Sequence, residues 1–194
     1  MPDRPTRRRL LAGATTSLLA RQAAATTDLL NIGSSRGKLD FAVGESRFFR
    51  ATGRFKDWHG KVRVDDVDVP SSRVDVIVLT KSVQMADENQ TEMLKAAEFF
   101  DISNFPHMTF RSLAVERTGE ETLRVVGLLT LRGIKRPMFL DASVTDRRPE
   151  AAPGDRYARF RASGSLQRSE FGMTKYLDVV GDNVEISIHA EAWR

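Results

Sequence analysis

The sequence predicts an all-β fold, a single domain of antiparallel strands with one short helix. From about residue 39 onward, apolar and polar residues alternate with a period of two, which is typical of strands that bury one face. Turn-forming residues recur at intervals of about ten positions, as they do in β-sandwiches and β-barrels. The chain has 194 residues, 41% of them hydrophobic, which is enough for one domain with a sizeable core.

The alternation is clearest toward the C-terminus. In residues 184–192 every second residue is apolar and those between are polar, and residues 158–166 follow the same rule. Residues 138–145 largely follow it too. Each segment predicts a strand with one dry face and one wet face. Further strands are expected near 39–44, 47–56, 58–65, 73–80, 107–117 and 122–132, which gives about nine in all.

One segment, residues 87–100, has helical periodicity. Asp87 is a suitable N-cap, acidic residues follow in the first turn, and an apolar stripe runs from Met93 to Phe100. Residues 125–129 are apolar on both faces, so we expect this helix to cover the outer side of that strand. The alternation itself fits either a sandwich or a closed barrel.

Residues 1–25 have the three-part layout of an export signal. A basic start precedes a weakly apolar stretch from Ala12 to Ala20, and Ala23–Ala25 offers a cleavage site. Thr6–Leu11 resembles the twin-arginine export motif. We therefore expect a signal peptide over residues 1–25, followed by a flexible segment over 26–38. A disordered basic arm or an organelle-targeting segment would have a similar composition.

The basic character of the chain is concentrated in this leader. Five of the 30 Lys and Arg residues lie in the first 25 residues, whereas only one of the 26 Asp and Glu residues does. The rest of the chain carries equal numbers of both charges. The composition therefore does not favour a nucleic-acid partner, which would need an excess of basic residues.

Catalytic and metal-binding motifs are lacking in the sequence. There is no cysteine, which excludes disulfides, thiolate metal sites, a cysteine nucleophile and a lipoprotein anchor on cysteine. The histidines, His59, His107 and His189, accompany no Gly-x-Ser-x-Gly elbow, and the spacing around His189 indicates a solvated strand face. We therefore expect neither an enzyme nor a metal or other cofactor.

Four stretches resemble a known family. They are ATGRFKDWHG at 51–60, AEFFDISNFPHMTFRS at 97–112, GLLTLRGIKRP at 127–137 and LQRSEFGM at 166–173. In this order and spacing they resemble the YceI-like family of periplasmic polyisoprenoid-binding proteins. The resemblance covers residues 39–194 and implies a lipocalin-like antiparallel barrel. It also implies a periplasmic location and a long-chain lipid whose tail lies inside the barrel.

The resemblance implies an apolar pocket formed by inward-facing side chains. Small residues at inward positions, Gly127, Ala162 and Gly164, would leave room for a chain, although the glycines fit close strand packing equally well. Arg168 is expected either to form a structural ion pair or to contact the lipid headgroup. The expected apolar contacts are Phe41, Phe48, Phe55, Val76, Val78, Leu94, Phe99, Phe110, Leu129, Leu131, Leu140, Phe160, Phe171, Met173, Ile186 and Ile188.

The chain departs from the family pattern at positions expected near the headgroup. Glu45, Met85 and Gln90–Thr91 replace residues that are typical of the family. We expect a non-enzymatic carrier of polyisoprenoid or a similar amphipathic lipid. Such a carrier would contact a membrane surface transiently, and it could act as a monomer or as a homodimer. The alternative is a structural or stress-response accessory protein that acts through a protein partner without a bound lipid.

Overall fold

The computed structural model describes residues 28–46, 49–65, 68–148, 152 and 154–194. The predicted signal peptide, residues 1–25, and Phe48 lie outside these ranges. Eleven strands form one sheet in the described part of the chain, in the order β1-β4-β5-β7-β8-β9-β10-β11-β2-β3-β6. Their bounds are β1 Asp28–Gly33, β2 Gly37–Ser46, β3 Phe49–Phe55, β4 Trp58–Val64, β5 Arg73–Leu79, β6 Val83–Met85, β7 His107–Arg117, β8 Thr122–Leu131, β9 Ile134–Arg147, β10 Arg156–Gln167 and β11 Asn183–Trp193.

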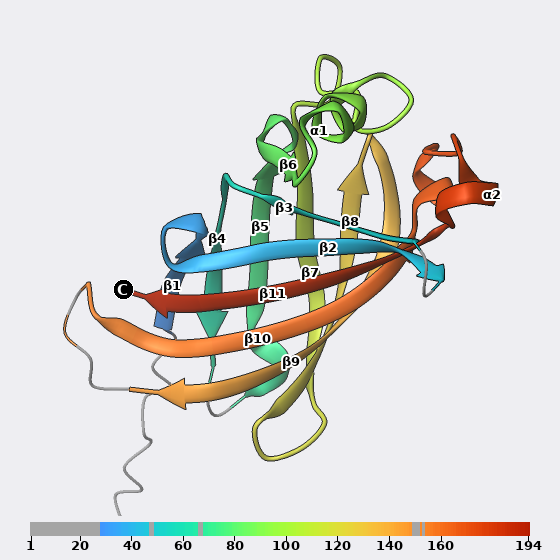
Figure 1. Ribbon diagram of the computed structural model, residues 1–194. Helices are drawn as coiled ribbons and strands as arrows, with labels where there is room; N and C mark the ends of the chain where they lie inside the picture. The colour runs from blue at the N-terminus through green and yellow to red at the C-terminus, as the bar shows by residue number, and fades with distance from the viewer. Residues whose placement is uncertain (1–27, 47–48, 66–67, 149–151, 153) are drawn as a thin grey trace, which may run out of the picture.

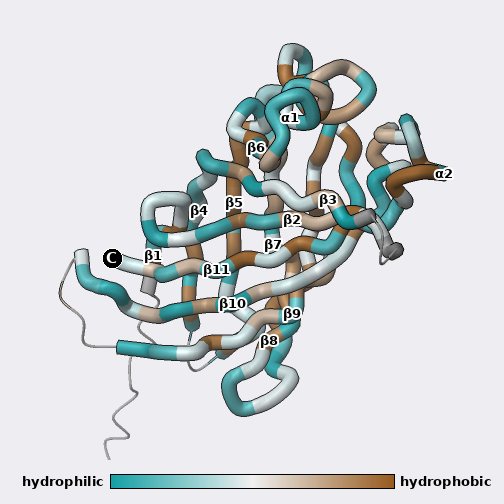
Figure 2. Tube along the Cα trace, viewed as in Figure 1, coloured by the Kyte–Doolittle hydropathy of each residue, from teal (hydrophilic) through white to brown (hydrophobic). Residues whose placement is uncertain are grey.

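The sheet closes into a barrel, which confirms the predicted fold class. All the neighbouring strands are antiparallel, and the ring closes where β1 pairs with β11 at Asn31 and Trp193. Beyond that pair, β11 continues along β2, and β3 and β6 extend the sheet over the upper part of the barrel. In Figure 1, β2, β11, β10 and β9 lie side by side and cross the direction of β4, β5, β7 and β8. Hydrophobic and hydrophilic residues alternate along these strands (Figure 2).

The segment 26–38, predicted to be flexible, instead contains β1 where the structure describes it. Leu30 and Ile32 alternate with the exposed Leu29, and both are buried in the core. The strand pairs with β4 along its whole length, from Asp28 opposite Val64 to Gly33 opposite His59. The inward alternation of β1 therefore makes it part of the barrel wall.

Helix α1, Glu88–Lys95, begins as predicted but ends before Phe100. The Asp87 carboxylate caps it by accepting a hydrogen bond from the Gln90 amide at 2.8 Å. After Lys95 the chain becomes extended at Ala96, and the side chain of Arg132 donates to the carbonyls of Ala97 and Phe99. The helix stops at the extended Ala96, and Arg132 from the β8–β9 turn bonds to carbonyls of the segment that follows. A second helix, α2 (Leu177–Val180), was not predicted.

The prediction that the helix covers residues 125–129 is wrong. Helix α1 contacts β6, where the Met85 amide donates to the Thr91 hydroxyl at 3.0 Å. Val126 and Leu128 face outward and are half-buried by their neighbours. On the adjacent strands Leu113 and Phe139 remain 55% and 56% exposed, so the outer face of β7–β9 carries apolar side chains in contact with solvent.

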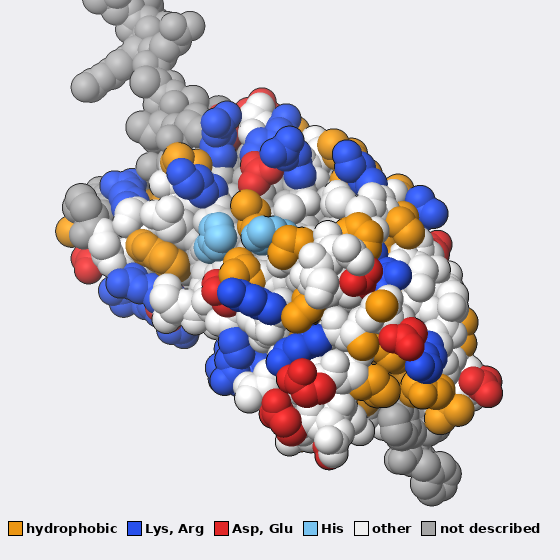
Figure 3. Space-filling model, turned by 90° about the horizontal axis from the view of Figure 1, so that it is seen from above, with side chains coloured by type: hydrophobic (Ala, Val, Ile, Leu, Met, Phe, Trp, Pro, Cys, Tyr) orange, Lys and Arg blue, Asp and Glu red, His pale blue; other side chains and the backbone are white. Residues whose placement is uncertain are grey.

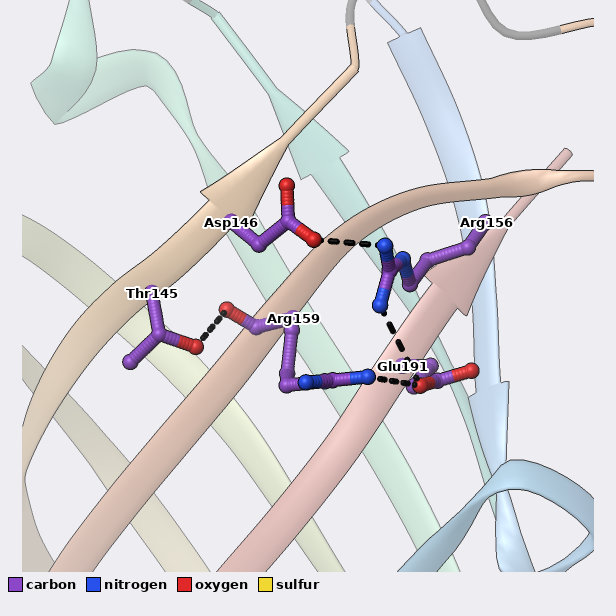
Figure 4. Close-up of polar contacts among 5 residues, drawn as sticks. All are labelled: Thr145, Asp146, Arg156, Arg159 and Glu191. Atoms are coloured by element: carbon purple, nitrogen blue, oxygen red, sulfur yellow. Dashed lines mark hydrogen bonds and ion pairs between the residues drawn. The ribbon is translucent and has the colours of Figure 1, made fainter.

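Ion pairs join β9, β10 and β11 near one end of the barrel (Figure 4). Arg156 lies 2.5 Å from the carboxylate of Asp146 and 3.6 Å from that of Glu191. Arg159 forms a further pair with Glu191 at 2.8 Å. These bonds, chiefly the one from Arg159, hold the pKa of Glu191 below its usual range. On the face seen in Figure 3, acidic and basic side chains are likewise interspersed.

The glycines on the inner face reflect close packing rather than open space. A Cβ atom on Gly127 would lie 2.4 Å from the Phe110 ring, and one on Gly53 would lie 2.4 Å from the Phe41 ring. A Cβ on Gly164 would lie 2.6 Å from the Phe139 carbonyl oxygen. Aromatic rings and neighbouring backbone therefore occupy the room that these glycines leave.

Replacing Gly127 by alanine is expected to destabilise the fold by about 1–3 kcal/mol, because the added methyl group forces the buried Phe110 ring to move. Chemical denaturation of the Gly127→Ala protein measures this loss. The double variant Phe110→Leu/Gly127→Ala is the control, since it removes the ring that the methyl meets. The double variant should lose less stability than the two single variants combined; simple additivity would contradict the packing explanation.

The Glu191 ion pairs predict a pH dependence of stability. The pKa of Glu191 is lower in the folded protein than in the unfolded chain. The ionised Glu191 carboxylate therefore stabilises the fold fully at pH values above its unfolded-state pKa, and this stabilisation is lost as pH falls through its folded-state pKa. The partly exposed pairs limit the effect to at most about 1 kcal/mol. Unfolding of Glu191→Gln, measured from about pH 6 to pH 3, should therefore depend less steeply on pH than that of the wild type. Arg159→Gln should flatten the same curve, and slopes equal to the wild type in both variants would refute the assignment.

Candidate ligand cavity

The barrel contains an elongated apolar cavity of about 470 Å³. Its lining side chains come from all the strands of the ring, and along β8 they include Leu123 near one end and Leu129 near the other. A ten-residue strand such as β8 is about 30 Å long, so the cavity follows much of the barrel. The volume lies within the range of about 300–1,000 Å³ that is typical of small-molecule sites. The arrangement is suited to a long, narrow, apolar ligand.

Most of the apolar residues that the sequence singled out line this cavity. Leu131 and Phe171 do not: they are buried in the core at the end of β8 and in the short turn Arg168–Phe171, without facing the cavity. Contact of the lining residues with a ligand stays a prediction. The predicted residues that line the cavity are Phe41, Phe55, Val76, Val78, Leu94, Phe99, Phe110, Leu129, Leu140, Phe160, Met173, Ile186, Ile188 and Arg168.

Several lining residues were missed by the sequence reasoning. Trp58, Val125 and Met138 lie at inward positions that the strand alternation could have identified. Tyr176 lies directly before α2 and Val180 is its last residue. This short helix has no periodic signal in the sequence. Among the lining residues are the methionines Met85, Met93, Met108 and Met138. Methionine side chains are flexible and adapt to irregular apolar partners.

One end of the cavity is closed by two segments that meet over it. Phe99, which follows α1, stacks on Tyr176, which precedes α2, with ring centroids 6.4 Å apart. Beside them Lys175 bonds to the Glu98 carboxylate at 3.0 Å, which raises the pKa of Lys175 and lowers that of Glu98. Both aromatic rings line the cavity. This end, which lies beside α1 and α2 in Figure 1 and is called the closed end below, is therefore covered by side chains from two separate loops.

The opposite end is a polar rim. Lining residues there come from the ends of β4, β7 and β9 and from the β7–β8 turn, shown below the barrel in Figure 1. Arg117 donates to the Glu120 carbonyl at 3.0 Å. Acidic groups outnumber basic ones among these residues, which are Asp65, Arg117, Glu120, Glu121, Asp146 and Arg147.

Arg168 lies at the closed end and is only 4% exposed. Its Nε donates to the Gly181 carbonyl, and its Nη1 donates to those of Met173 and Lys175, each at 2.8 Å. Its Nη2 is buried and has no hydrogen-bond partner among the described residues. Burial lowers the pKa of Arg168, an effect that the charge of Asp182 opposes.

The expected structural ion pair of Arg168 is replaced by these carbonyl bonds. The Asp182 carboxylate bonds instead to Ser169, accepting from its amide at 2.8 Å and from its hydroxyl at 2.6 Å. Arg168 therefore fixes the turn between β10 and α2 while one of its nitrogen atoms is left over. Trp58, 2% exposed, also lines the cavity, and its buried indole N–H has no partner among the described residues.

The histidines lie away from the cavity. His59, His107 and His189 are all exposed, and none is among the lining residues. The described part of the chain contains no group of three or more His, Cys, Asp or Glu residues placed to hold a metal ion. Within that part, too, no helix is long and apolar enough to cross a membrane.

Comparison with known proteins identifies relatives of the whole barrel. The YceI-like domain family matches residues 30–192. Protein YceI of Salmonella newport is 30% identical over 153 residues, which make up 79% of each chain. The crystal structure of BcnA from Burkholderia cenocepacia has a TM-score of 0.72 at 20% identity, with coverage of 81% of this chain and 97% of BcnA. A polyisoprenoid-binding domain from Saccharophagus degradans has a TM-score of 0.63 at 11% identity, with coverage of 87% and 99%.

The two solved structures share the fold, and the family match extends over nearly all of the barrel, from β1 into β11. The resemblance seen in the four sequence stretches is therefore confirmed. On the family match and the Salmonella relative, this chain belongs to the YceI-like family.

Proposed function

We propose that the protein is a non-enzymatic periplasmic carrier that binds a polyisoprenoid or a similar long-chain amphipathic lipid in the barrel. The observation that carries the proposal is the elongated cavity, whose walls are almost entirely apolar. The polyisoprenoid-binding domain of Saccharophagus degradans, which has the same fold, supports this class of ligand.

Binding of such a chain requires shape and apolar surface rather than reactive groups. Burial of apolar surface contributes about 25 cal/mol per Å², or about 0.8 kcal/mol for each CH₂ group. A chain threaded along β8 would contact many lining residues at once. The periplasmic location rests on the predicted twin-arginine leader, and transient contact with a membrane surface would let the carrier collect its ligand.

Organic extraction of the purified full-length protein tests the proposal directly. Mass spectrometry of the extract should detect a long-chain lipid at a near-equimolar ratio to protein, because removal of the chain would expose the apolar cavity to water. An extract without lipid, from protein that also fails to bind added long-chain lipid, would support an accessory role without a ligand.

Filling the cavity should reduce binding. Ala162 lines the cavity from β10, so Ala162→Phe places a ring in the path of the chain. We expect the lipid-to-protein ratio to fall below about half of the wild-type value. Ser163→Phe is the matched control, because Ser163 is the next residue on the same strand and faces solvent. Circular dichroism establishes that both variants fold; equal lipid content in the two would place the ligand outside the barrel.

A further inference from the structure

We propose that Arg168 binds the headgroup of the lipid and that this headgroup carries an anionic oxygen, as a carboxylate or phosphate does. The inference rests on the proposed lipid-binding function and adds to it the chemistry and the position of the headgroup. It places the headgroup at the closed end of the cavity, beneath α2, with the chain running toward the polar rim.

The hydrogen bonds of the guanidinium group leave one of its nitrogen atoms without a partner among the described residues. Three N–H donors of Arg168 are used by the carbonyls of Met173, Lys175 and Gly181. The Nη2 atom is buried, has no partner in the described structure, and belongs to a side chain that lines the cavity. Buried donors in proteins are nearly always satisfied, so an unpaired donor on a side chain that lines a ligand cavity indicates an acceptor on the ligand.

The charge of Arg168 favours the same assignment. The guanidinium group is almost wholly removed from water, and its bonded partners are neutral carbonyls. The nearest carboxylate, that of Asp182, is engaged by the amide and hydroxyl of Ser169. A buried cation without a directly bonded anion favours a ligand that supplies one, because charge-assisted hydrogen bonds to anionic oxygens are stronger than those to neutral acceptors.

The two ends of the cavity differ in charge. At the rim Arg117 lies among Glu120, Glu121 and Asp146, and its Nη1 already donates to a backbone carbonyl. Asp146 is paired with Arg156, so Glu120 and Glu121 are the carboxylates at this end that disfavour an anionic headgroup. At the closed end the cationic Arg168 is held rigidly by its three carbonyl bonds, so little side-chain freedom is lost when a headgroup binds. The anionic end of the lipid is therefore assigned to Arg168.

Carbon-13 NMR of a fatty acid labelled at its carboxyl carbon tests this assignment in the wild-type protein. A pH titration of the bound acid should give a carboxyl pKa below that of the same acid free in dilute solution, because the guanidinium group stabilises the carboxylate. An unchanged or raised pKa would overturn the assignment, since it would place the carboxyl in water or in apolar surroundings.

Affinities for a fatty acid and for the alcohol of the same chain length give a second test. Wild-type protein should prefer the acid by about ten- to a hundredfold, the range expected for a hydrogen bond to a charged group. Arg168→Gln should remove most of this preference, measured as the ratio of the two affinities in the same variant. Arg161→Gln, which removes an exposed arginine of β10 that does not line the cavity, is the matched control and should retain the preference.

The outcomes separate the two proposals. Equal binding of acid and alcohol by the wild type would overturn the headgroup assignment and leave lipid binding intact. Failure to bind either ligand would overturn lipid binding and the assignment with it. Inorganic phosphate alone should not bind measurably at millimolar concentration; if it occupied the site as tightly as a lipid phosphate, the site would be one for a free anion. The NMR measurement needs no variant, so it decides the assignment even if Arg168→Gln fails to fold.

Discussion

Closure of the sheet into a ring is the constraint on which the rest of the structure depends. Because β1 pairs with β11, every strand of the ring directs alternate side chains into one enclosed space. Those side chains must be apolar to avoid unpaired polar groups, and their combined volume decides whether the interior is a solid core or a cavity. In this chain it leaves about 470 Å³. The cavity is therefore a consequence of closure together with the sizes of the inward-facing residues.

Closure also explains why the ends of the barrel differ from its wall. Backbone that leaves the ladder must find other hydrogen-bond partners, and at the closed end arginine side chains provide them. Arg132 bonds to carbonyls that follow α1, and Arg168 bonds to carbonyls that precede or follow α2. Arg168, which completes the fold at this end, thus also brings a positive charge to the cavity. Structure and the proposed headgroup recognition depend on one guanidinium group.

The parts of the fold that could be predicted are those governed by local periodicity. The alternation in β10 and β11 and the cap at Asp87 depend only on neighbouring residues, so the sequence alone specifies them. The end of α1 could not be predicted, because the segment after it leaves the helix at Ala96 and is held by Arg132, which is distant in sequence. Strand β1 was missed because its alternation is short and lies beside the leader. The prediction that a helix covers residues 125–129 was wrong, because half-buried apolar residues on an outer face produce the same sequence pattern as a covered strand.

The site was predictable to a similar degree. Inward aromatic residues such as Phe55 and Phe110 follow from alternation, and closure brings them together around one cavity. Whether a glycine such as Gly127 opens space could not be inferred, because the answer depends on a ring from the adjacent strand. The partners of Arg168 could not be inferred either, since backbone carbonyls carry no sequence signature.

The most direct measurement of the central claim is whether a lipid chain contacts Trp58, which lines the cavity and is almost fully buried. The chain has two tryptophans, so Trp193→Phe leaves Trp58 as the only source of tryptophan fluorescence. Titration of this variant with a fatty acid brominated along its chain should quench Trp58 and saturate near equimolar ligand, because bromine quenches tryptophan only at close range. Bound brominated lipid that leaves Trp58 fluorescence unchanged would show that the chain does not lie in the barrel.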